Sequence, residues 1–307
     1  MKVKRIALVS AAAMALSGGV ALTGCSSVTE VDSLATVNGT KLTQSEFDDL
    51  AKLLDEAGVF KLTDGKLTSD DARQLLLTMI NAQIVRDVLD ENEITVTDAD
   101  RKAFADKLAG SDQTAGYPQG LTDYVVNLYA EQAALANVSK LSASQVEALY
   151  NSMPGASGMM CLRHLVVEDE ATAEKALAEY NDGADFADLA GKYSTEPNAA
   201  ETGGALRDSA NDNDCIAVSQ YQRQFDLDFV RGALTAKAGE VVGPIKSSFG
   251  WHLIQARPFD EVEDSIVKTF TDNTGAALAD ALWLNGDIRV DSQFGKWDAP
   301  SGTIVDL

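Results

Sequence analysis

Histidine is nearly absent from this chain of 307 residues, and basic residues are scarce. The only two histidines, His164 and His252, stand in the short apolar runs "CLRHLVVE" and "SSFGWHLIQA". Lys and Arg number 25 against 47 Asp and Glu, which gives a formal net charge of −22. A surface this acidic repels nucleic acid and anionic lipid headgroups, so no nucleic-acid partner is expected. What remains to be explained is why two such rare imidazoles both interrupt strand-like segments.

A long apolar run occurs only at the start of the chain. Three basic residues precede the apolar run 6–22, which is too short and too rich in Ala, Ser and Gly for a stable membrane span. We therefore expect a signal peptide over residues 1–24. The run ends in "LTGC", which resembles the lipobox of bacterial lipoproteins and implies cleavage before Cys25 and a diacylglyceryl group on its sulfur. The alternative is an ordinary secretory signal with a chance cysteine.

The polar segment after this site reads as a tether, residues 25–33, between a membrane and a soluble body. Removal of residues 1–24 leaves 22 Lys and Arg against 47 Asp and Glu, a formal charge of −25. Because such a surface has no basic patch for lipid headgroups, attachment would depend on the acyl chains of Cys25. Two or more chains anchor firmly. The expected location is extracytoplasmic and lipid-anchored to the cell membrane.

Cysteine is also rare, and only Cys161 and Cys215 remain once Cys25 is assigned to lipid. In an oxidising compartment the two thiols are a candidate disulfide. Zinc is the alternative, because Cys161 and His164 have a C-x-x-H spacing that Cys215 and His252 could complete. The second pair lacks a compact ligand spacing, so the zinc signal is weak.

Residues 34–153 read as mostly helical. Asn38-Gly39 is typical of a type I′ turn between two short strands. Thr43 and Glu46 then form a capping box that starts a helix. Apolar residues at helical spacing predict a long helix from Ser69, and further helices are expected within 95–110, 121–140 and 142–153.

The segment 154–160, "PGASGMM", is the clearest break in composition and predicts a hinge. Strands and helices interleave after it, which indicates a compact domain with its own core. Strands are expected at 161–167, 239–247 and 250–258, and helices at 170–183, 185–194 and 224–234. A helix within 262–286 and a short strand at 288–291 close the pattern.

Four stretches in this order resemble the parvulin family of peptidyl-prolyl cis/trans isomerases: "CLRHLVVE", "GADFADLAGKYSTEP", "ETGGAL" and "AGEVVGPIKSSFGWHLI". The resemblance covers about a third of the chain. The flanking "ATVNGTKLTQSEFDDL" and "DIRVDSQFGKWD" resemble, more weakly, the chaperone part of PrsA-like and SurA-like extracytoplasmic foldases. Together the two resemblances imply an α+β fold. A mostly helical chaperone domain, 34–153, would pack with a C-terminal segment, 259–307, and an inserted parvulin domain, 156–258, would hold a small antiparallel sheet flanked by helices.

The resemblance also implies a site around the two histidines. His164 and His252 would lie on adjacent strands with facing imidazoles, which can share a hydrogen bond only in complementary tautomers. This pair would orient and tune the site rather than attack substrate. Glu196 falls near the position of the reacting amide, and Ser247 at that of a hydroxyl bonded to the histidines. The alternatives are an exposed loop glutamate and a surface serine.

A proline pocket follows from the same resemblance. Leu206, Tyr221 and Phe225 match the family's pocket positions, and Ile216 is a neighbour; ordinary core packing is the alternative for each. Prolyl isomerisation requires no cofactor, and none is expected. The partners would be unfolded or partly folded exported polypeptides that contain X-Pro bonds.

The chain departs from the family in one loop. Relatives usually read G-G-D-L-G, whereas this chain has "GGALR" followed by the acidic "DSANDND", so the loop over the pocket and catalytic efficiency are in doubt. The family fold would place Cys161 and Cys215 close together, with a disulfide pinning this loop. The acidic "EDEATAE" argues against phosphate-directed specificity. The expected function is a membrane-anchored foldase that isomerises X-Pro bonds and holds exported chains; the alternative is a non-catalytic chaperone on a parvulin scaffold.

Overall fold

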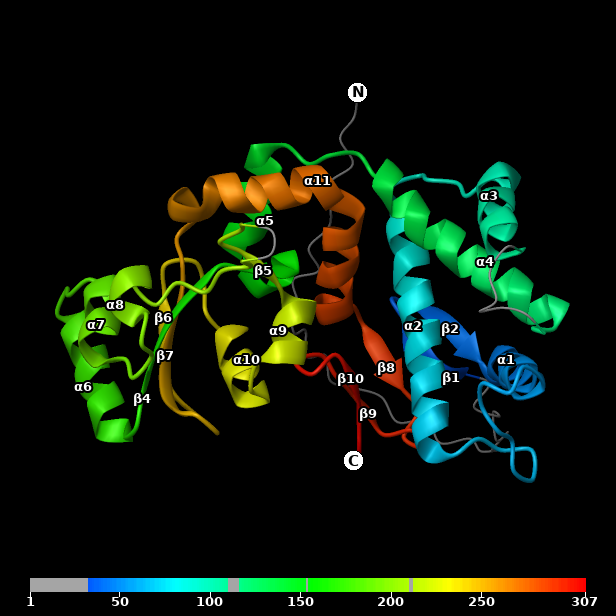
Figure 1. The fold of residues 1–307 in the computed structure, drawn as a ribbon, viewed down its shortest axis with the longest axis horizontal. Helices are drawn as coiled ribbons and strands as arrows, with labels where there is room; N and C mark the ends of the chain where they lie inside the picture. Colours follow the sequence, from blue (N-terminus) through cyan, green and yellow to red (C-terminus); the bar gives the residue numbers. More distant parts are fainter. Residues whose placement is uncertain (1–32, 110–115, 153, 210–211) are drawn as a thin grey trace, which may run out of the picture. The chain divides into compact units, whose positions relative to one another are not determined.

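The computed structural model describes residues 33–109, 116–152, 154–209 and 212–307 (Figure 1). The expected signal peptide and the lipobox cysteine, Cys25, lie outside these residues. None of the described helices is long and apolar enough to cross a membrane.

The body begins with the hairpin that the sequence predicts. Strands β1 (Ser33–Val37) and β2 (Thr40–Thr43) pair antiparallel, and both turn residues, Asn38 and Gly39, have positive φ. The capping box is also present: the Thr43 side chain accepts from the Glu46 backbone N–H, and the Glu46 carboxylate accepts from the Thr43 N–H. Both predictions are confirmed because each depends on residues that are neighbours in the sequence.

Helices follow in the order that the apolar spacing predicts. They are α1 (Gln44–Glu56), α2 (Ser69–Glu91), α3 (Asp98–Ala109), α4 (Gln119–Ala134), a short 3₁₀ helix (Leu135–Asn137) and α5 (Ala143–Ser152). Leu76 and Ile80 of α2 are fully buried in a core shared with β1 and α1.

The segment that composition marks as a hinge is packed against a helix. It forms a 3₁₀ helix (Pro154–Ser157) and strand β3 (Met159–Met160). Gly158 lies so close to α11 (Phe259–Asn285) that an added Cβ would stand 2.8 Å from the carbonyl oxygen of Ala277. The glycine therefore serves close backbone packing, and the hinge at this segment stays a prediction.

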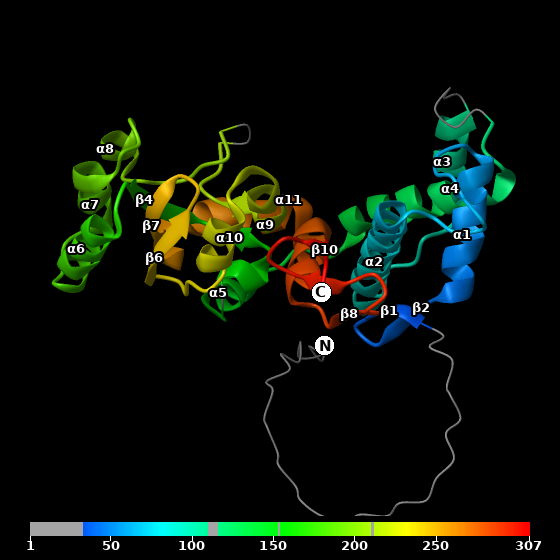
Figure 2. The same ribbon diagram turned by 90° about the horizontal axis from the view of Figure 1, so that it is seen from below.

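Three antiparallel strands form the sheet that carries both histidines. The order is β4-β7-β6, with β4 (Leu162–Val167), β6 (Val241–Ser247) and β7 (Gly250–Ala256). Helices α6 (Glu170–Asn181) and α7 (Phe186–Tyr193) pack on the face of Leu165 and Leu253. The opposite face packs on α9 (Val218–Gln224) and α10 (Leu227–Ala233), as Figures 1 and 2 show. Side chains alternate between two cores, so residues two apart share a face.

Two short elements complete this region. Helix α8 (Ala199–Thr202) follows α7, and strand β5 (Ile216–Ala217) pairs with β3. The short helix expected over 224–234 is present as α10, which begins only at Leu227. Helix α9 was not predicted, and the extended backbone of Phe225, with φ −111° and ψ 159°, separates the two.

The chain then returns to its first hairpin. Helix α11 is interrupted by non-helical φ and ψ at Asn273, and β8 (Ile288–Val290) pairs with β1, which gives the sheet order β2-β1-β8. Strands β9 (Lys296–Asp298) and β10 (Thr303–Val305), which the sequence analysis missed, form a final hairpin. The fold is α+β, as expected.

Candidate active site

The two histidines occupy one face of the sheet. In the β4–β7 ladder His164 stands opposite Ile254 and His252 opposite Val166, so the two imidazoles are diagonal neighbours. Their rings are nearly parallel, 11° apart, and the Nδ1 atoms are 3.4 Å apart. Both residues are 4% exposed. Strand register thus brings together the only two imidazoles of the sequence.

An acidic group and a hydroxyl group stand at the two ends of this pair. Oε2 of Glu196 lies 2.9 Å from Nε2 of His164. Ser247 Oγ lies 2.7 Å from Nε2 of His252, and the Phe249 backbone N–H donates to the same Oγ at 3.0 Å. Four side chains therefore form one continuous polar row.

The carboxylate determines the direction of the hydrogen bonds. An ionised carboxylate only accepts, so Glu196 favours a proton on Nε2 of His164 and leaves the Nδ1 of that ring as an acceptor. The Nδ1–H of His252 then donates to it, and the Nε2 of His252 accepts from the Ser247 hydroxyl. These protons are assigned from the network. Because the two Nδ1 atoms share one hydrogen bond, only one of them carries a proton.

The electrostatics agree with a neutral His252. Burial, and after it the neighbouring His164, lowers the pKa of His252 to about 4, although the negative charges of Glu196 and Asp226 oppose this effect. Contact with the His164 imidazole holds the pKa of the Glu196 carboxyl below its usual range. Near pH 7 the row contains an ionised carboxylate and an uncharged His252.

Phe229, which the sequence analysis did not select, lies edge-on to both imidazoles. The ring centroids are 5.5 Å from His164 and 5.2 Å from His252. Phe225 stacks on Phe229 at 5.3 Å, and Tyr221 packs on Phe225 at 4.8 Å. No helical spacing reveals it, because the backbone of Phe225 is extended and only Phe229 lies on α10.

Asp226 is the second residue that the sequence analysis missed. Its side chain caps the start of α10 and accepts from both the backbone N–H and the hydroxyl of Ser248, at 3.1 and 2.7 Å. It therefore joins α10 to the turn between β6 and β7, next to Ser247. No local pattern reveals a contact across 22 residues.

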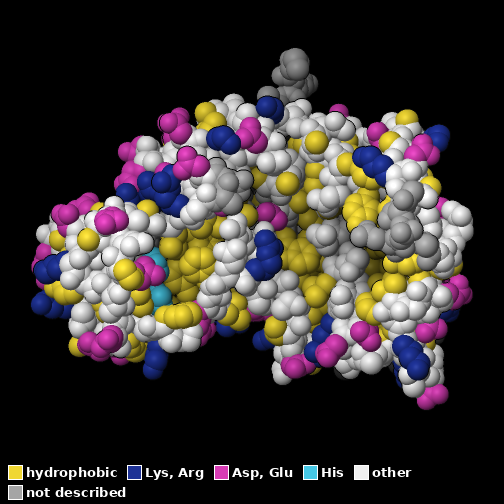
Figure 3. All heavy atoms as spheres, in the orientation of Figure 1, with side chains coloured by type: hydrophobic (Ala, Val, Ile, Leu, Met, Phe, Trp, Pro, Cys, Tyr) yellow, Lys and Arg dark blue, Asp and Glu magenta, His cyan; other side chains and the backbone are white. Residues whose placement is uncertain are grey.

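The four expected pocket residues share one apolar cluster. Tyr221 is fully buried and Ile216 is 4% exposed, whereas Leu206 and Phe225 are only partly buried. Leu206 and Phe225 are thus the members that solvent reaches, and the other two lie beneath. The space-filling view shows histidine at the surface beside a hydrophobic patch (Figure 3).

The altered "GGALR" loop pairs directly with β4. The His164 N–H donates to the carbonyl of Gly204 at 2.8 Å, and the Leu206 N–H donates to that of Leu162 at 2.9 Å. Gly204 has φ +74°, and an added Cβ would stand 2.2 Å from the carbonyl oxygen of His164. Arg207, which replaces the usual glycine, lies 2.8 Å from both Asp212 and Asp214. The loop position is set by contacts with acidic side chains and with β4.

The structure contains a disulfide between Cys161 and Cys215, 54 residues apart. Cys161 precedes β4 and Cys215 precedes β5, so the bond joins the first strand of the site to the end of the acidic loop. Its sulfurs are not available as thiolates for the zinc alternative. Within the described residues, no group of three or more His, Cys, Asp or Glu side chains could hold a metal ion.

Comparisons with known proteins identify the region around these residues. The model of the family described as "PPIC-type PPIASE domain" matches residues 167–257, which include Glu196, Ser247 and His252. Foldase protein PrsA of Caldanaerobacter subterraneus subsp. tengcongensis is 28% identical over 275 residues, 81% of this chain and 83% of that protein. Foldase protein PrsA 3 of Bacillus anthracis is 32% identical over 148 residues, 44% of this chain and 48% of that protein.

A solved structure, that of PrsA from Bacillus subtilis, is 22% identical and covers 79% of this chain and 86% of its own, with a TM-score of 0.29. By the match of the family model, residues 167–257 form a PPIC-type peptidyl-prolyl isomerase domain, in a chain that is similar over most of its length to a PrsA foldase.

Proposed function

We propose that this chain is a membrane-anchored extracytoplasmic foldase that isomerises X-Pro bonds in exported polypeptides and holds those polypeptides while they are unfolded. The observation that carries the enzymatic part is the buried imidazole pair between Glu196 and Ser247, beside an apolar cluster in which Leu206 and Phe225 are only partly buried.

The reaction needs binding rather than covalent chemistry. Rotation about an X-Pro bond has a barrier of about 20 kcal/mol, and lowering it by about 5 kcal/mol accelerates the reaction several thousand-fold. In our proposal Leu206 and Phe225 bind the proline ring, and Tyr221 and Ile216 support them from beneath. An apolar site favours the twisted amide because that state has lost resonance and needs less solvation of its carbonyl oxygen.

The histidines position the polar groups. The row from Ser247 to Glu196 is fixed in one direction by the carboxylate, so the Glu196 oxygens are held beside the apolar cluster without rearrangement during the reaction. We assign Glu196 an electrostatic or hydrogen-bonding role toward the amide, and we assign His164, His252 and Ser247 roles as positioning residues.

We propose residues 156–258 as the isomerase domain, and residues 34–153 with 259–307 as the holding domain. The pairing of β8 with β1 supports this division, because it joins segments about 250 residues apart. The burial of Ile288 and Ile304 in the same core as α1 and α2 supports it further. The isomerase segment then lies between two parts of one domain.

An isomerase assay on a short proline peptide tests the enzymatic proposal. Phe225→Ala removes an aromatic contact, for which we expect a loss of at least about tenfold in kcat/KM. His252→Ala should lower activity and stability together. Gln224→Ala, at an exposed neighbouring position, is the matched control and should retain the wild-type rate. Equal background rates in all four proteins would refute isomerisation.

The second candidate, a non-catalytic chaperone, is favoured by the Arg207 contacts in the altered loop. It predicts suppression of the aggregation of a proline-free client without any isomerase rate. If both activities are present, the second candidate is excluded.

Membrane attachment rests on the lipobox-like sequence before Cys25. In cells fed labelled palmitate, we expect label on the wild-type protein and none on Cys25→Ser, together with release of the variant from the membrane fraction. Membrane retention of an unlabelled Cys25→Ser protein would contradict a lipid anchor.

A further inference from the structure

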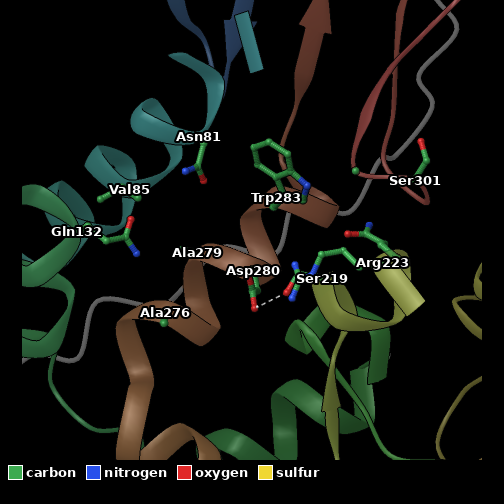
Figure 4. Close-up of a pocket in the computed structure, with 12 residues that line it drawn as sticks. Asn81, Val85, Gln132, Ser219, Arg223, Ala276, Ala279, Asp280, Trp283 and Ser301 are labelled. Atoms are coloured by element: carbon green, nitrogen blue, oxygen red, sulfur yellow. Dashed lines mark hydrogen bonds between the residues drawn. The ribbon is translucent and has the colours of Figure 1, made fainter. Parts of the chain in front are cut away.

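A cavity of about 370 Å³ lies apart from the histidines, and neither histidine lines it. Figure 4 shows α2 and α4 on one side of it, α9 on the other and α11 between them. It is lined by Asn81, Val85, Gln132, Ser219, Gln222, Arg223, Ala276, Ala279, Asp280, Trp283, Ser301 and Gly302. Helix α9 also carries Tyr221, so one helix contributes to both sites.

The cavity combines one group that only accepts hydrogen bonds with one that only donates them. Asp280 lies on α11 and Arg223 on α9, and within the described part of the chain no ion pair of 4.0 Å or less joins them. The Ser219 hydroxyl donates to the Asp280 carboxylate at 3.4 Å. Burial raises the pKa of Asp280 to about 6, which shows that its neighbours compensate it only in part.

Carboxamides supply both kinds of group on the remaining walls. Asn81 on α2 and Gln132 on α4 are exposed, and their side-chain amides make no hydrogen bond among the described residues. Figure 4 shows both side chains at the cavity. Gln222 donates to the Ala299 carbonyl at 2.8 Å, which holds its amide in place. A carboxamide offers an acceptor and two donors, so these walls can match a ligand with alternating polarity.

A polypeptide main chain is the ligand that fits this set. Each peptide group presents one N–H and one C=O, which suit Asp280, Arg223 and the carboxamides, and it carries no net charge. Val85, Ala276 and Trp283 supply apolar surface for side chains. An anionic or cationic small molecule fits less well, because the acidic and basic side chains of the cavity cancel.

We propose that this cavity binds the main chain of an unfolded polypeptide, independently of proline, and so forms the client site of the holding function proposed above. Because α9 lines both the cavity and the apolar cluster at the histidines, a client held here has its neighbouring residues near the isomerase segment.

The test uses the full chain and a fluorescein-labelled, proline-free polypeptide of Gly, Ser, Ala and Leu, with anisotropy as the readout. The variant Asn81→Leu/Gln132→Leu removes two carboxamides at exposed positions, and we expect its Kd to rise about tenfold. Gln74→Leu/Gln119→Leu makes the same change at exposed positions on α2 and α4 outside the cavity, and should bind like the wild type. Isomerisation of a short peptide should be unchanged in both.

A second probe isolates main-chain recognition. The same polypeptide with N-methylated peptide groups lacks N–H donors, and the wild type should bind it at least tenfold more weakly. Equal binding of both probes, or equal Kd values for the cavity variant and its control, would overturn the cavity proposal while leaving the holding function intact. If the wild type binds neither probe, the holding function itself fails.

Discussion

Acidification from pH 7.5 to pH 4 should weaken the fold through His252. The pKa of its imidazole is 6.5 in a model peptide and about 4 in the folded chain. Between these values the unfolded chain binds a proton that the folded chain excludes, so the free energy of unfolding decreases as the pH falls. The decrease begins near pH 6.5 and ends below pH 4. It amounts to at most about 3 kcal/mol, of which about 1.3 kcal/mol is lost by pH 5.5.

Other groups titrate in the same range, so the effect must be isolated by difference. Asp280 acts in the opposite direction: its pKa is raised from 3.8 to about 6, so the folded chain gains a proton first and is favoured as the pH falls through 6. Urea unfolding of the wild type and of His252→Gln at pH 7.5 and 5.5 separates the two terms. The wild type should lose about 1.3 kcal/mol more than the variant over this interval.

Nuclear magnetic resonance provides the direct assay. The sequence has two histidines, so the Cε1–H region contains two signals, and His252→Gln assigns them. The signal of His252 should remain that of a neutral imidazole down to about pH 5. A midpoint at pH 6 or above, or an equal loss of stability in wild type and variant, would refute the reasoning about burial.

Three further predictions concern the surroundings of the pair. Ser247→Ala leaves the buried Nε2 of His252 without a hydrogen-bond partner, which should lower the free energy of unfolding by about 1 to 3 kcal/mol and also lower kcat/KM. Ser247→Thr restores the hydroxyl and should rescue both. An unchanged rate in the alanine variant would contradict the proposed row. Reduction of the Cys161–Cys215 bond should lower the free energy of unfolding by about 4 kcal/mol, because the bond closes a separation of 54 residues. Urea unfolding with and without dithiothreitol measures this loss. An equal effect of dithiothreitol on Cys161→Ser/Cys215→Ser, which has no such bond, would contradict the prediction. Gly204→Ala should lower the free energy of unfolding more than Gly183→Ala, for which a loss of about 1 kcal/mol is expected. Both glycines have positive φ, but only at Gly204 would the added Cβ clash with backbone atoms. Equal losses in the two variants would show that backbone strain alone, without the clash, determines the cost.

Features that depend on sequence neighbours were predictable. The turn at Asn38-Gly39 and the capping box of Thr43 and Glu46 follow from side chains at most three residues apart, and both are present. The long helix from Ser69 is present as well, because its apolar spacing repeats over six turns. Such signals are local and do not depend on tertiary contacts with the rest of the chain.

Features that depend on contacts between distant segments were not predictable. Composition marks residues 154–160 as a hinge, but the structure packs Gly158 against α11 so closely that an added Cβ would stand 2.8 Å from the carbonyl oxygen of Ala277. The β9–β10 hairpin has strands of three residues, too short for an alternating pattern to be recognised. Pairing of β8 with β1 was not predicted, because no local signal specifies a partner so far away. The family resemblance implied only that residues 259–307 pack with the N-terminal domain.

The candidate site combines both kinds of information. Each histidine could be placed on a strand from its own apolar run, but the direction of their shared hydrogen bond depends on a third residue. Glu196 is ionised at neutral pH and lies at one end of the row, so it favours a proton on the Nε2 of His164. In the role that we propose for it, the carboxylate acts on the reacting amide and also orients the His164 imidazole, which contacts His252 and, through it, Ser247.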